Sequence, residues 1–392
     1  MKIAVLTSGR LPVPAVLGGA VENLIDFYLE YNNAHHLYDI TVYSIKQDKI
    51  ISPDTDCNHY CYIDIKSFRA KIARKIFSKF NKSPYYDSEI EYFLHKSLKH
   101  LRRQNYDCVI LENRPGYAMA VRKVTDAPIV LHLHNDLLNK DTFCGRDIYS
   151  LLSKVITVSN YIKGCVETLG AEIPVETVHN GIDLERFQRK PDAITMVKRA
   201  DLNLREDDFV VVYSGRLTKE KGIKELLEAF LMLRDYPSIK LMVMGSSFFG
   251  GQSKTTDSFV VELQQLADKM PGKVVFTGFV SYDMVPYYLG LADIAVVPSM
   301  WEEPFALTCV EAMAAGLPII AANSGGITES CGGCAVIVDK NNHNIVFMLY
   351  EVILKLFKDD KQRQTMSSSG VLISQRYGKL RYSENFFNKL KL

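Results

Sequence analysis

The chain has 392 residues, which suits two or three domains, and 47% of them are hydrophobic, so it can fill real cores. Its formal net charge of +2 is close to neutral and gives no reason to expect a nucleic-acid partner. No apolar run reaches the roughly 18–20 residues that a membrane span needs. The apolar start, residues 1–6, is too short for a signal peptide and predicts a buried strand, so we expect a cytoplasmic protein.

Along the first half of the chain, short apolar strands alternate with helical patterns, as in parallel α/β layers. The pattern predicts strands over residues 2–7, 39–44, 107–112, 128–134, 155–158 and 174–179. It predicts helices over residues 20–33, 68–80, 88–104 and 115–124. The polar segment 191–208 follows and is predicted to be a linker.

A second series of strands, each followed by a helical pattern, is predicted over residues 209–214, 239–244, 274–278, 293–298 and 318–322. The two series predict an α/β protein with two doubly wound parallel sheets, whose ligands lie outside the carboxyl ends of the strands. We expect an N-terminal domain over 1–190, a C-terminal domain over 191–375 and a last helical segment over 376–392.

Eight cysteines in a chain without a secretion signal indicate reduced thiols. Cys331 and Cys334 have a spacing seen in zinc and redox sites, but zinc needs two further ligands nearby. The other close pair, Cys57 and Cys61, belongs to the other half of the sequence. We therefore expect no metal site and no redox function for these cysteines.

The most informative stretch is residues 301–316, which places Glu303 before a predicted helix and Glu311 two turns inside it. Pro304 suits the first helical position, and Gly316 predicts a left-handed helix end. Eight helical residues rise about 12 Å, wider than the roughly 5–9.5 Å between the carboxyls of a glycosidase pair. Two carboxylates so placed, with a helix N-terminus between them for an anion, fit the two ends of a nucleotide diphospho-sugar.

Glu303, seven intervening residues and Glu311, followed by residues 312–316, resemble the signature of the retaining glycosyltransferases of family 4, also called glycosyl transferases group 1. That family has the GT-B fold, in which two Rossmann-like domains face each other across a cleft and the last helix crosses back onto the N-terminal domain. The resemblance implies that Glu303 contacts the donor sugar as a catalytic residue and that Glu311 contacts the ribose. It also implies donor contacts from the residues between them, Phe305, Ala306, Leu307 and Thr308. Ala306 departs from the usual glycine, which leaves slightly less room beside a phosphate.

Two glycine-containing turns after predicted strands suit phosphate binding. One carries Arg216, which can bind two phosphate oxygens at once, and Lys221, a mobile point charge. It resembles the family's Gly-Arg…Lys-Gly motif, which implies that both cations hold the donor diphosphate in place of a metal. The other turn, with Gly18 and Gly19, resembles the family's Gly-Gly loop over the donor phosphates, and it lacks the G-x-G-x-x-G spacing of a dinucleotide site.

Polar residues follow two further strands of the first half. His134 ends the predicted strand 128–134 and resembles the family's active-site histidine near the transferred sugar, whereas His132 is expected to pack or to support it. Asn113 and Arg114 follow another strand, where either contact with an acceptor or capping of the next helix is open. A Ser-Gly-Gly loop at 324–326 also resembles a family loop, with no role assigned.

Residues 65–82 form a basic amphipathic pattern with seven Lys or Arg and no acid. Its apolar residues recur at helical spacing: Ile65, Phe68, Ile72, Ile76 and Phe80. Such a helix binds an anionic membrane surface or packs its apolar face on the domain, and the sequence leaves both open. Membrane binding would suit a polyprenyl-linked acceptor and a peripheral position at the inner face of the plasma membrane.

The resemblance implies a retaining transfer that needs neither metal nor cofactor, with a nucleotide diphospho-sugar as co-substrate. The acceptor would be a saccharide or a polyprenyl-linked glycan in bacterial polysaccharide or glycolipid synthesis. A nucleotide-sugar epimerase of GT-B fold is the alternative. A silent scaffold is disfavoured because the charged motif residues are all present, and an NAD-dependent oxidoreductase because the glycine fingerprint is missing. The sequence leaves the sugar, the nucleobase and the acceptor open.

Overall fold

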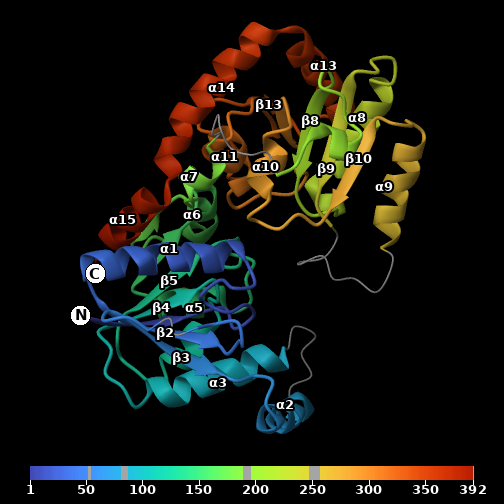
Figure 1. The fold of residues 1–392 in the computed structure, drawn as a ribbon. Coiled ribbons are helices and arrows are strands. Elements are labelled where there is room, and N and C mark those ends of the chain that lie inside the picture. The colour runs from blue at the N-terminus through green and yellow to red at the C-terminus, as the bar shows by residue number, and fades with distance from the viewer. Residues whose placement is uncertain (52–53, 81–86, 189–195, 247–256, 392) are drawn as a thin grey trace. The chain divides into compact units, whose positions relative to one another are not determined.

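The computed structural model describes residues 1–51, 54–80, 87–188, 196–246 and 257–391, of which 77–80 are described by their backbone alone. The chain divides into two compact units (Figure 1). Unit 1 comprises Met1–Gly181 together with Lys379–Leu392, and unit 2 comprises Ile182–Gly378. The units therefore divide after residues 181 and 378, where the sequence pattern suggested 190 and 375.

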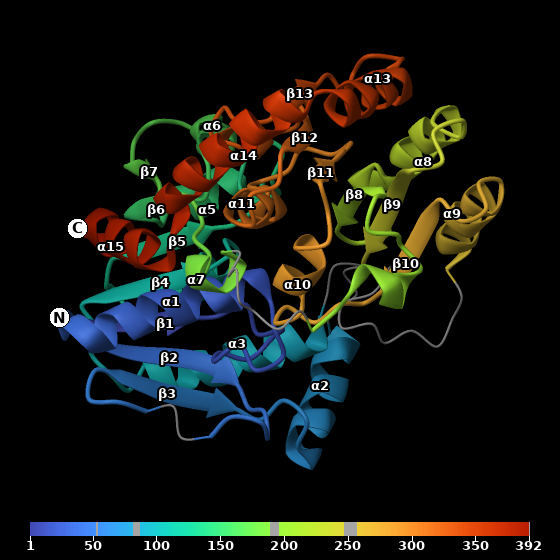
Figure 2. The same ribbon diagram turned by 45° about the horizontal axis from the view of Figure 1, so that its top comes forward.

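Unit 1 contains a seven-stranded parallel sheet in the order β3-β2-β1-β4-β5-β6-β7. The strands are β1 (Lys2–Leu6), β2 (Asp39–Ile45), β3 (Asn58–Ile63), β4 (Cys108–Glu112), β5 (Ile129–Leu133), β6 (Lys154–Thr157) and β7 (Val175–Thr177). Figure 2 shows β1 between β2 and β4, where the strand order reverses. In a doubly wound sheet, this reversal opens the ligand-binding crevice at the carboxyl ends of the strands.

The edge strand β3 is absent from the strands that the sequence predicts. Its residues, Asn58–Ile63, are mostly half-buried or exposed, whereas every residue of β4 and of β5 is buried. A strand that is covered on both faces shows as a continuous apolar run, and an edge strand does not. The sequence also missed β13 (Val336–Val338), the edge strand of the second sheet, because an apolar run of three residues is too short to predict a strand.

Helices cover both faces of the first sheet. They are α1 (Ala20–His35), α2 (Phe68–Phe80), α3 (Ser88–Leu101), α4 (Tyr117–Val121), α5 (Gly145–Ser150), α6 (Asn160–Glu167) and α15 (Lys379–Leu390). The C-terminal helix α15 lies beside α1 (Figure 1), where Phe386 stacks on Tyr28 with ring centroids 4.4 Å apart. The Nζ of buried Lys154 donates to the Lys389 carbonyl over 2.9 Å and so binds the end of α15 to β6.

Unit 2 repeats the same strand order with six parallel strands, β10-β9-β8-β11-β12-β13, which reverses between β8 and β11. Besides β13, these are β8 (Phe209–Ser214), β9 (Ile239–Met244), β10 (Val274–Gly278), β11 (Ile294–Val297) and β12 (Ile319–Ala322). The helices are α7 (Leu184–Phe187), α8 (Ile223–Met232), α9 (Ser258–Asp268), α10 (Val285–Leu289), α11 (Leu307–Ala314), α12 (Ile327–Ser330), α13 (Ile345–Lys358) and α14 (Asp360–Ser374). One core joins β8, β9 and β11 to α8, α9 and α13, and α11 packs against α14.

The start of α11 corrects the prediction that Pro304 is the first helical residue. The helix begins at Leu307, and the carbonyl of Glu303 accepts from the backbone N–H of Gly326 over 2.7 Å, so the segment before the helix is bonded to the 324–326 loop. Glu311 is therefore the fifth residue of the helix and lies about one turn inside it. The left-handed end is confirmed, since Gly316 has a φ of 75°.

The described part of the expected linker is packed onto unit 2. Residues 189–195 lie outside the described residues, but a 3-10 turn at Arg199–Leu202 follows them. The Arg199 guanidinium donates to the carbonyls of Asp208 and Leu291 over 2.7 and 2.9 Å and pairs with Asp293 at 3.0 Å. Among the described residues no helix has the length and apolar character to cross a membrane.

Candidate active site

The turn after β8 brings Lys221 to Glu303 at the carboxyl edge of the second sheet. Lys221 Nζ lies 2.5 Å from Glu303 Oε1, and the Ser299 hydroxyl donates to the same oxygen over 2.7 Å. Arg216 pairs with Glu220 at 3.5 Å. Glu303 is only 8% exposed, so its carboxylate is held by a cation and a hydroxyl inside the unit.

Close backbone packing fixes this turn. Gly222 has a φ of 71°, and a Cβ there would lie 1.9 Å from the carbonyl oxygen of Pro298, just after β11. The Glu220 carbonyl accepts from the Met300 N–H over 2.9 Å. The cationic turn after β8 and the segment after β11 are thus packed closely together, and only glycine fits at residue 222.

The loop at 324–326, to which the sequence assigned no role, holds the segment that leads to Glu303. The Gly325 N–H donates to Glu302 Oε2 over 2.5 Å, and the Ser324 hydroxyl donates to the Trp301 carbonyl. Gly325 has a φ of 51°, and a Cβ there would lie 2.4 Å from the Glu303 carbonyl oxygen. Glycine at 325 therefore lets this loop support Glu303 at close range.

Glu311 lies buried in α11, with the hydroxyl of Tyr282 as its hydrogen-bond partner. Burial raises the pKa of Glu311 to about 7, although the hydrogen bond from Tyr282 lowers it in part. The Tyr282 ring packs at 5.7 Å against Phe187, and the Arg186 guanidinium lies 5.2 Å from its centre. Tyr282 was missed by the sequence reasoning because nothing in its spacing relates it to Glu311, about 30 residues further on.

The four residues around the start of α11, residues 305–308, form two pairs: one precedes the helix and the other begins it. Phe305 and Ala306 are buried, and the Phe305 ring meets Tyr377 edge-on at 5.7 Å. Leu307 and Thr308 are the first two residues of the helix. Backbone N–H groups in a first turn have no acceptor within the helix and carry the positive end of its dipole. This terminus can therefore donate to an anion next to Glu303.

The glycine loop of unit 1 precedes α1. Gly18 and Gly19 have φ values of 75° and 116°, which favour glycine. A Cβ on Gly19 would lie 2.2 Å from Glu22 Oε2, so the buried Glu22 carboxylate covers this glycine. Burial raises the pKa of Glu22. Glu22 is a further buried acid at this edge that sequence reasoning missed.

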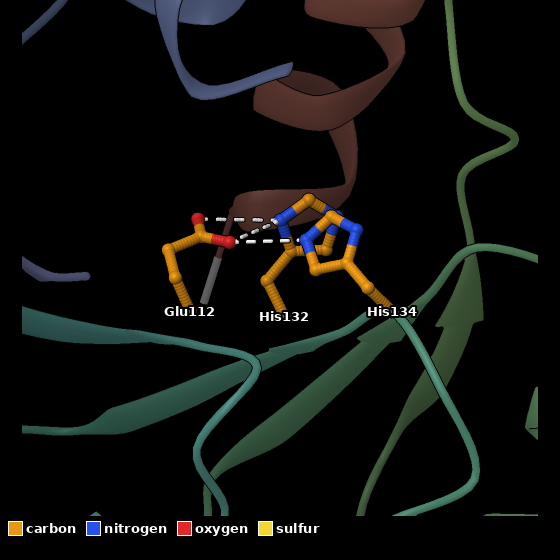
Figure 3. Close-up of side chains that lie close together, drawn as sticks. All are labelled: Glu112, His132 and His134. Atoms are coloured by element: carbon orange, nitrogen blue, oxygen red, sulfur yellow. Dashed lines mark hydrogen bonds and ion pairs between the residues drawn. The ribbon is translucent and has the colours of Figure 1, made fainter. Parts of the chain in front are cut away.

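His134 belongs to a buried network at the carboxyl ends of β4 and β5 (Figure 3). Glu112 Oε2 lies 3.0 Å from His132 Nδ1 and 3.1 Å from His134 Nε2, and Glu112 Oε1 accepts from the Tyr28 hydroxyl over 3.0 Å. Burial and the neighbouring His132 lower the pKa of His134, so its imidazole is neutral at physiological pH. Burial opposes ionisation of Glu112, but the two imidazoles outweigh it and lower the pKa of this carboxyl.

For Asn113 and Arg114 the sequence left two roles open, contact with an acceptor and capping of the next helix. The structure shows which contacts the two side chains make within unit 1. Asn113 has a φ of 58°, and its side-chain oxygen accepts from the His134 N–H over 3.0 Å. Arg114 Nε donates to the Ser8 carbonyl over 3.2 Å. Neither side chain caps α4. Asn113 thus holds the backbone of His134 in place.

Glu112, His132 and His134 are the one group of His, Cys, Asp or Glu within the described ranges whose ligand atoms lie close enough to share a metal ion. The sequence prediction of no metal site did not consider this group. All eight cysteines are free thiols. Cys334 Sγ lies 3.1 Å from Sδ of Met313, so this thiol packs against a side chain of α11.

Two doubly wound parallel sheets, each with polar groups at its carboxyl edge, define the GT-B fold class. The fold is similar to that of Anabaena HepE, solved in complex with UDP and glucose, with a TM-score of 0.73, 21% identity and coverage of 100% of this chain and 99% of HepE. Sucrose-phosphate synthase from Thermosynechococcus elongatus gives a TM-score of 0.75 at 17% identity, over 99% of this chain and 98% of that one.

Two family models match the sequence: Glycosyltransferase Family 4 over residues 54–186 and Glycosyl transferases group 1 over residues 196–371. YtcC of Bacillus subtilis is 30% identical over 341 residues, which are 84% of this chain and 76% of YtcC. The lipopolysaccharide 1,2-N-acetylglucosaminetransferase of Salmonella typhimurium is 31% identical over 226 residues, 56% of this chain and 55% of that enzyme. The chain belongs to the family 4 glycosyltransferases of GT-B fold.

Proposed function

We propose that this glycosyltransferase moves a sugar from a nucleotide diphospho-sugar to a saccharide or lipid-linked acceptor, with retention of the anomeric configuration and without a metal ion. One observation carries the proposal: the carboxyl edge of the second sheet combines the Lys221–Glu303 pair with the first turn of α11. A cation, free backbone N–H groups and a carboxylate are the groups that a sugar diphosphate requires.

The donor is assigned to unit 2 in three parts. Arg216, Lys221 and the first turn of α11 bind the diphosphate, Glu303 binds the sugar hydroxyls, and Glu311 binds the ribose. The two protein cations supply the positive charge that a metal supplies elsewhere. The structures of HepE with UDP and with UDP-glucose support a nucleotide sugar as the donor class and make these two compounds the first probes.

We assign the acceptor to unit 1. His134, which belongs to the same unit, is assigned to contact the transferred sugar. In a retaining transfer, the acceptor oxygen attacks the anomeric carbon on the face from which the phosphate leaves. The bond from the anomeric carbon to the phosphate oxygen breaks, the bond to the acceptor oxygen forms, and the acceptor proton passes to the departing phosphate. This course needs no strong enzymatic base, which agrees with a neutral His134 that contacts the sugar.

Product analysis tests the proposal. A thermal-shift screen first identifies the donor, because a ligand at 100 times its Kd adds about 2.7 kcal/mol of stability. We then expect transfer to a saccharide or lipid-linked acceptor in the presence of EDTA, with the donor's anomeric configuration in the NMR spectrum of the product. An inverted linkage would overturn the retaining assignment, and an epimerised nucleotide sugar formed without acceptor would establish the alternative.

Donor affinity is expected to rise with pH through the titration of Glu311. Its pKa is raised to about 7, so below that pH the carboxyl is protonated and is a poorer acceptor for ribose hydroxyls. We expect UDP-glucose, whose diphosphate has no proton to lose in this range, to bind about tenfold more weakly at pH 6 than at pH 8. Calorimetry on Glu311→Gln should show weaker binding with this pH dependence removed. An equal pH dependence in both proteins would exclude Glu311 as its source.

We also propose that α2 binds an anionic membrane surface. Three residues of its apolar stripe are exposed rather than packed on the unit: Phe68 is 77%, Ile72 47% and Ile76 50% exposed. Arg74 pairs with Glu89 at 2.8 Å and donates to the Ile65 carbonyl, so its charge is directed toward the unit. Lys79 and Phe80 have no described side chains, and residues 81–82 of the basic stretch lie outside the described residues. The exposed stripe and its flanking cations support this proposal.

Replacement of the three exposed cations of α2 by glutamine is expected to release the protein from vesicles that contain phosphatidylglycerol. Arg69, Lys71 and Lys75 contribute about 1 kcal/mol each, so binding should fall about 100-fold at low salt. A matched control removes three exposed cations at the end of α3, namely Lys99, Arg102 and Arg103, and should bind nearly as tightly as wild type. Equal losses in both variants, measured by vesicle co-sedimentation, would argue for general charge attraction only.

A further inference from the structure

The network around Glu112 leaves one nitrogen of each histidine, His132 Nε2 and His134 Nδ1, buried and without a hydrogen-bond partner among the described residues. Glu112 and His132 have fully buried side chains, and the side chain of His134 is 5% exposed. His134 Nε2 meets the Glu112 carboxylate, whereas Nδ1 is buried and has no hydrogen-bond partner among the described residues. A buried polar atom without a partner in a native protein calls for an explanation.

The carboxylate determines where the imidazole protons lie. An ionised Glu112 can only accept, so the nitrogens that face it, His132 Nδ1 and His134 Nε2, each carry a proton. In a neutral imidazole the other nitrogen then has a lone pair and no proton. For His134 this nitrogen is Nδ1, which is therefore an acceptor.

The two histidines differ in their surroundings. His132 lies within β5, and its ring packs 5.0 Å from Phe386 of α15. His134 follows the end of β5, at the carboxyl edge of the sheet where ligands of this fold class bind. The rings lie 4.1 Å apart, so His132 also fills the space beside His134. Of the two unpartnered nitrogens, His134 Nδ1 therefore belongs to the residue at the ligand-binding edge, whereas His132 Nε2 belongs to a residue inside the strand.

We propose that Glu112 is a positioning residue that fixes the tautomer of His134, so that His134 Nδ1 accepts a hydrogen bond from a hydroxyl of the transferred sugar. The contact with the sugar rests on the function proposed above, whereas the tautomer rests on the network alone. The Asn113 side chain supports the same geometry, because it accepts from the backbone N–H of His134 over 3.0 Å.

A metal ion bound by the same three residues predicts the opposite proton positions. A metal would take the lone pairs of His132 Nδ1 and His134 Nε2, and the proton of His134 would then lie on Nδ1. Nitrogen-15 NMR of histidine side chains distinguishes the two states in the wild-type protein. His134→Gln identifies the signals of this residue among those of the nine histidines. We expect a protonated Nε2 and a bare Nδ1. A protonated Nδ1, or one equivalent of a transition metal in the purified protein, would overturn the proposal.

Two substitutions of Glu112 test its role in catalysis. Glu112→Leu removes the acceptor, so we expect a mixture of His134 tautomers and a kcat lower by about tenfold to a hundredfold, with the KM for the donor nearly unchanged. Glu112→Gln should have the wild-type His134 tautomer and the wild-type kcat. Its amide oxygen has two lone pairs for the imidazoles, and its NH2 can donate to the Tyr28 hydroxyl.

Tyr28→Phe is the matched control, because it removes a hydrogen bond to the same carboxylate and leaves both imidazole bonds intact. We expect it to keep the wild-type tautomer and kcat. An unchanged kcat in folded Glu112→Leu would overturn the positioning role. If Glu112→Leu does not fold, the wild-type tautomer and the Glu112→Gln variant still decide the proposal. Absence of any glycosyl transfer by the wild type, with the tautomer as expected, would instead refute the proposed function alone.

Discussion

Glu303→Ala is expected to lower kcat by about 10²–10³-fold, the usual cost of losing one electrostatic contact to a transition state. The variant should keep its affinity for UDP, because the proposed partner of Glu303 is the donor sugar, which UDP lacks. Loss of the carboxylate also releases Lys221, its partner at 2.5 Å, to a bound phosphate. Steady-state kinetics and UDP calorimetry measure the two effects separately.

A matched control is Glu262→Ala, which breaks a similar pair with Lys224, at 2.6 Å, on the surface of the same unit. Its kcat and UDP affinity should stay within about twofold of wild type, as expected for an exposed pair. Glu311→Ala should show the complementary pattern, with weaker binding of both UDP and UDP-glucose. If Glu303→Ala loses its affinity for UDP and Glu311→Ala keeps it, the donor binds in the reverse orientation, with its ribose near Glu303 and its sugar near Glu311.

Arg216→Ala and Lys221→Ala are each expected to weaken UDP binding by about 10- to 100-fold, since each removes a charge-assisted contact to phosphate. Arg216→Lys should recover only part of this loss, because an ammonium group cannot bind two oxygens in the planar geometry of a guanidinium. Isothermal titration calorimetry of folded variants gives the affinities.

Lys219→Ala is the control for these two variants, because Lys219 is an exposed cation of the same turn whose Nζ lies 5.9 Å from the ring centre of Phe259. It should bind UDP nearly as well as wild type. Equal losses in all three alanine variants would indicate only the general charge of the turn. The double variant Lys221→Ala/Glu303→Ala should be non-additive for UDP binding, since the two side chains are paired in the unliganded protein.

The amount of structure that the sequence predicted depended on burial. The strands at the centre of each sheet were found because both of their faces are covered, which requires continuous apolar runs. Strand β3 shows no such run and β13 is only three residues long, so both were missed. Helix α2 was predicted with its observed bounds from its apolar spacing, but spacing alone does not show whether an apolar face is covered. The three-dimensional fold leaves Phe68, Ile72 and Ile76 of this face exposed.

By itself, the sequence identified the residues that we propose for donor binding, since Arg216, Lys221, Glu303 and Glu311 lie in two contiguous motifs that follow strands. It also determined the end of α11, because a glycine with positive φ acts locally. Only the tertiary structure decided the start of that helix, where the Glu303 carbonyl accepts from the Gly326 N–H, and the hydrogen-bond partners of Glu311 and His134. Tyr282 and Glu112 reach Glu311 and His134 through hydrogen bonds that the fold creates, and no local pattern encodes contacts between residues so far apart in the chain.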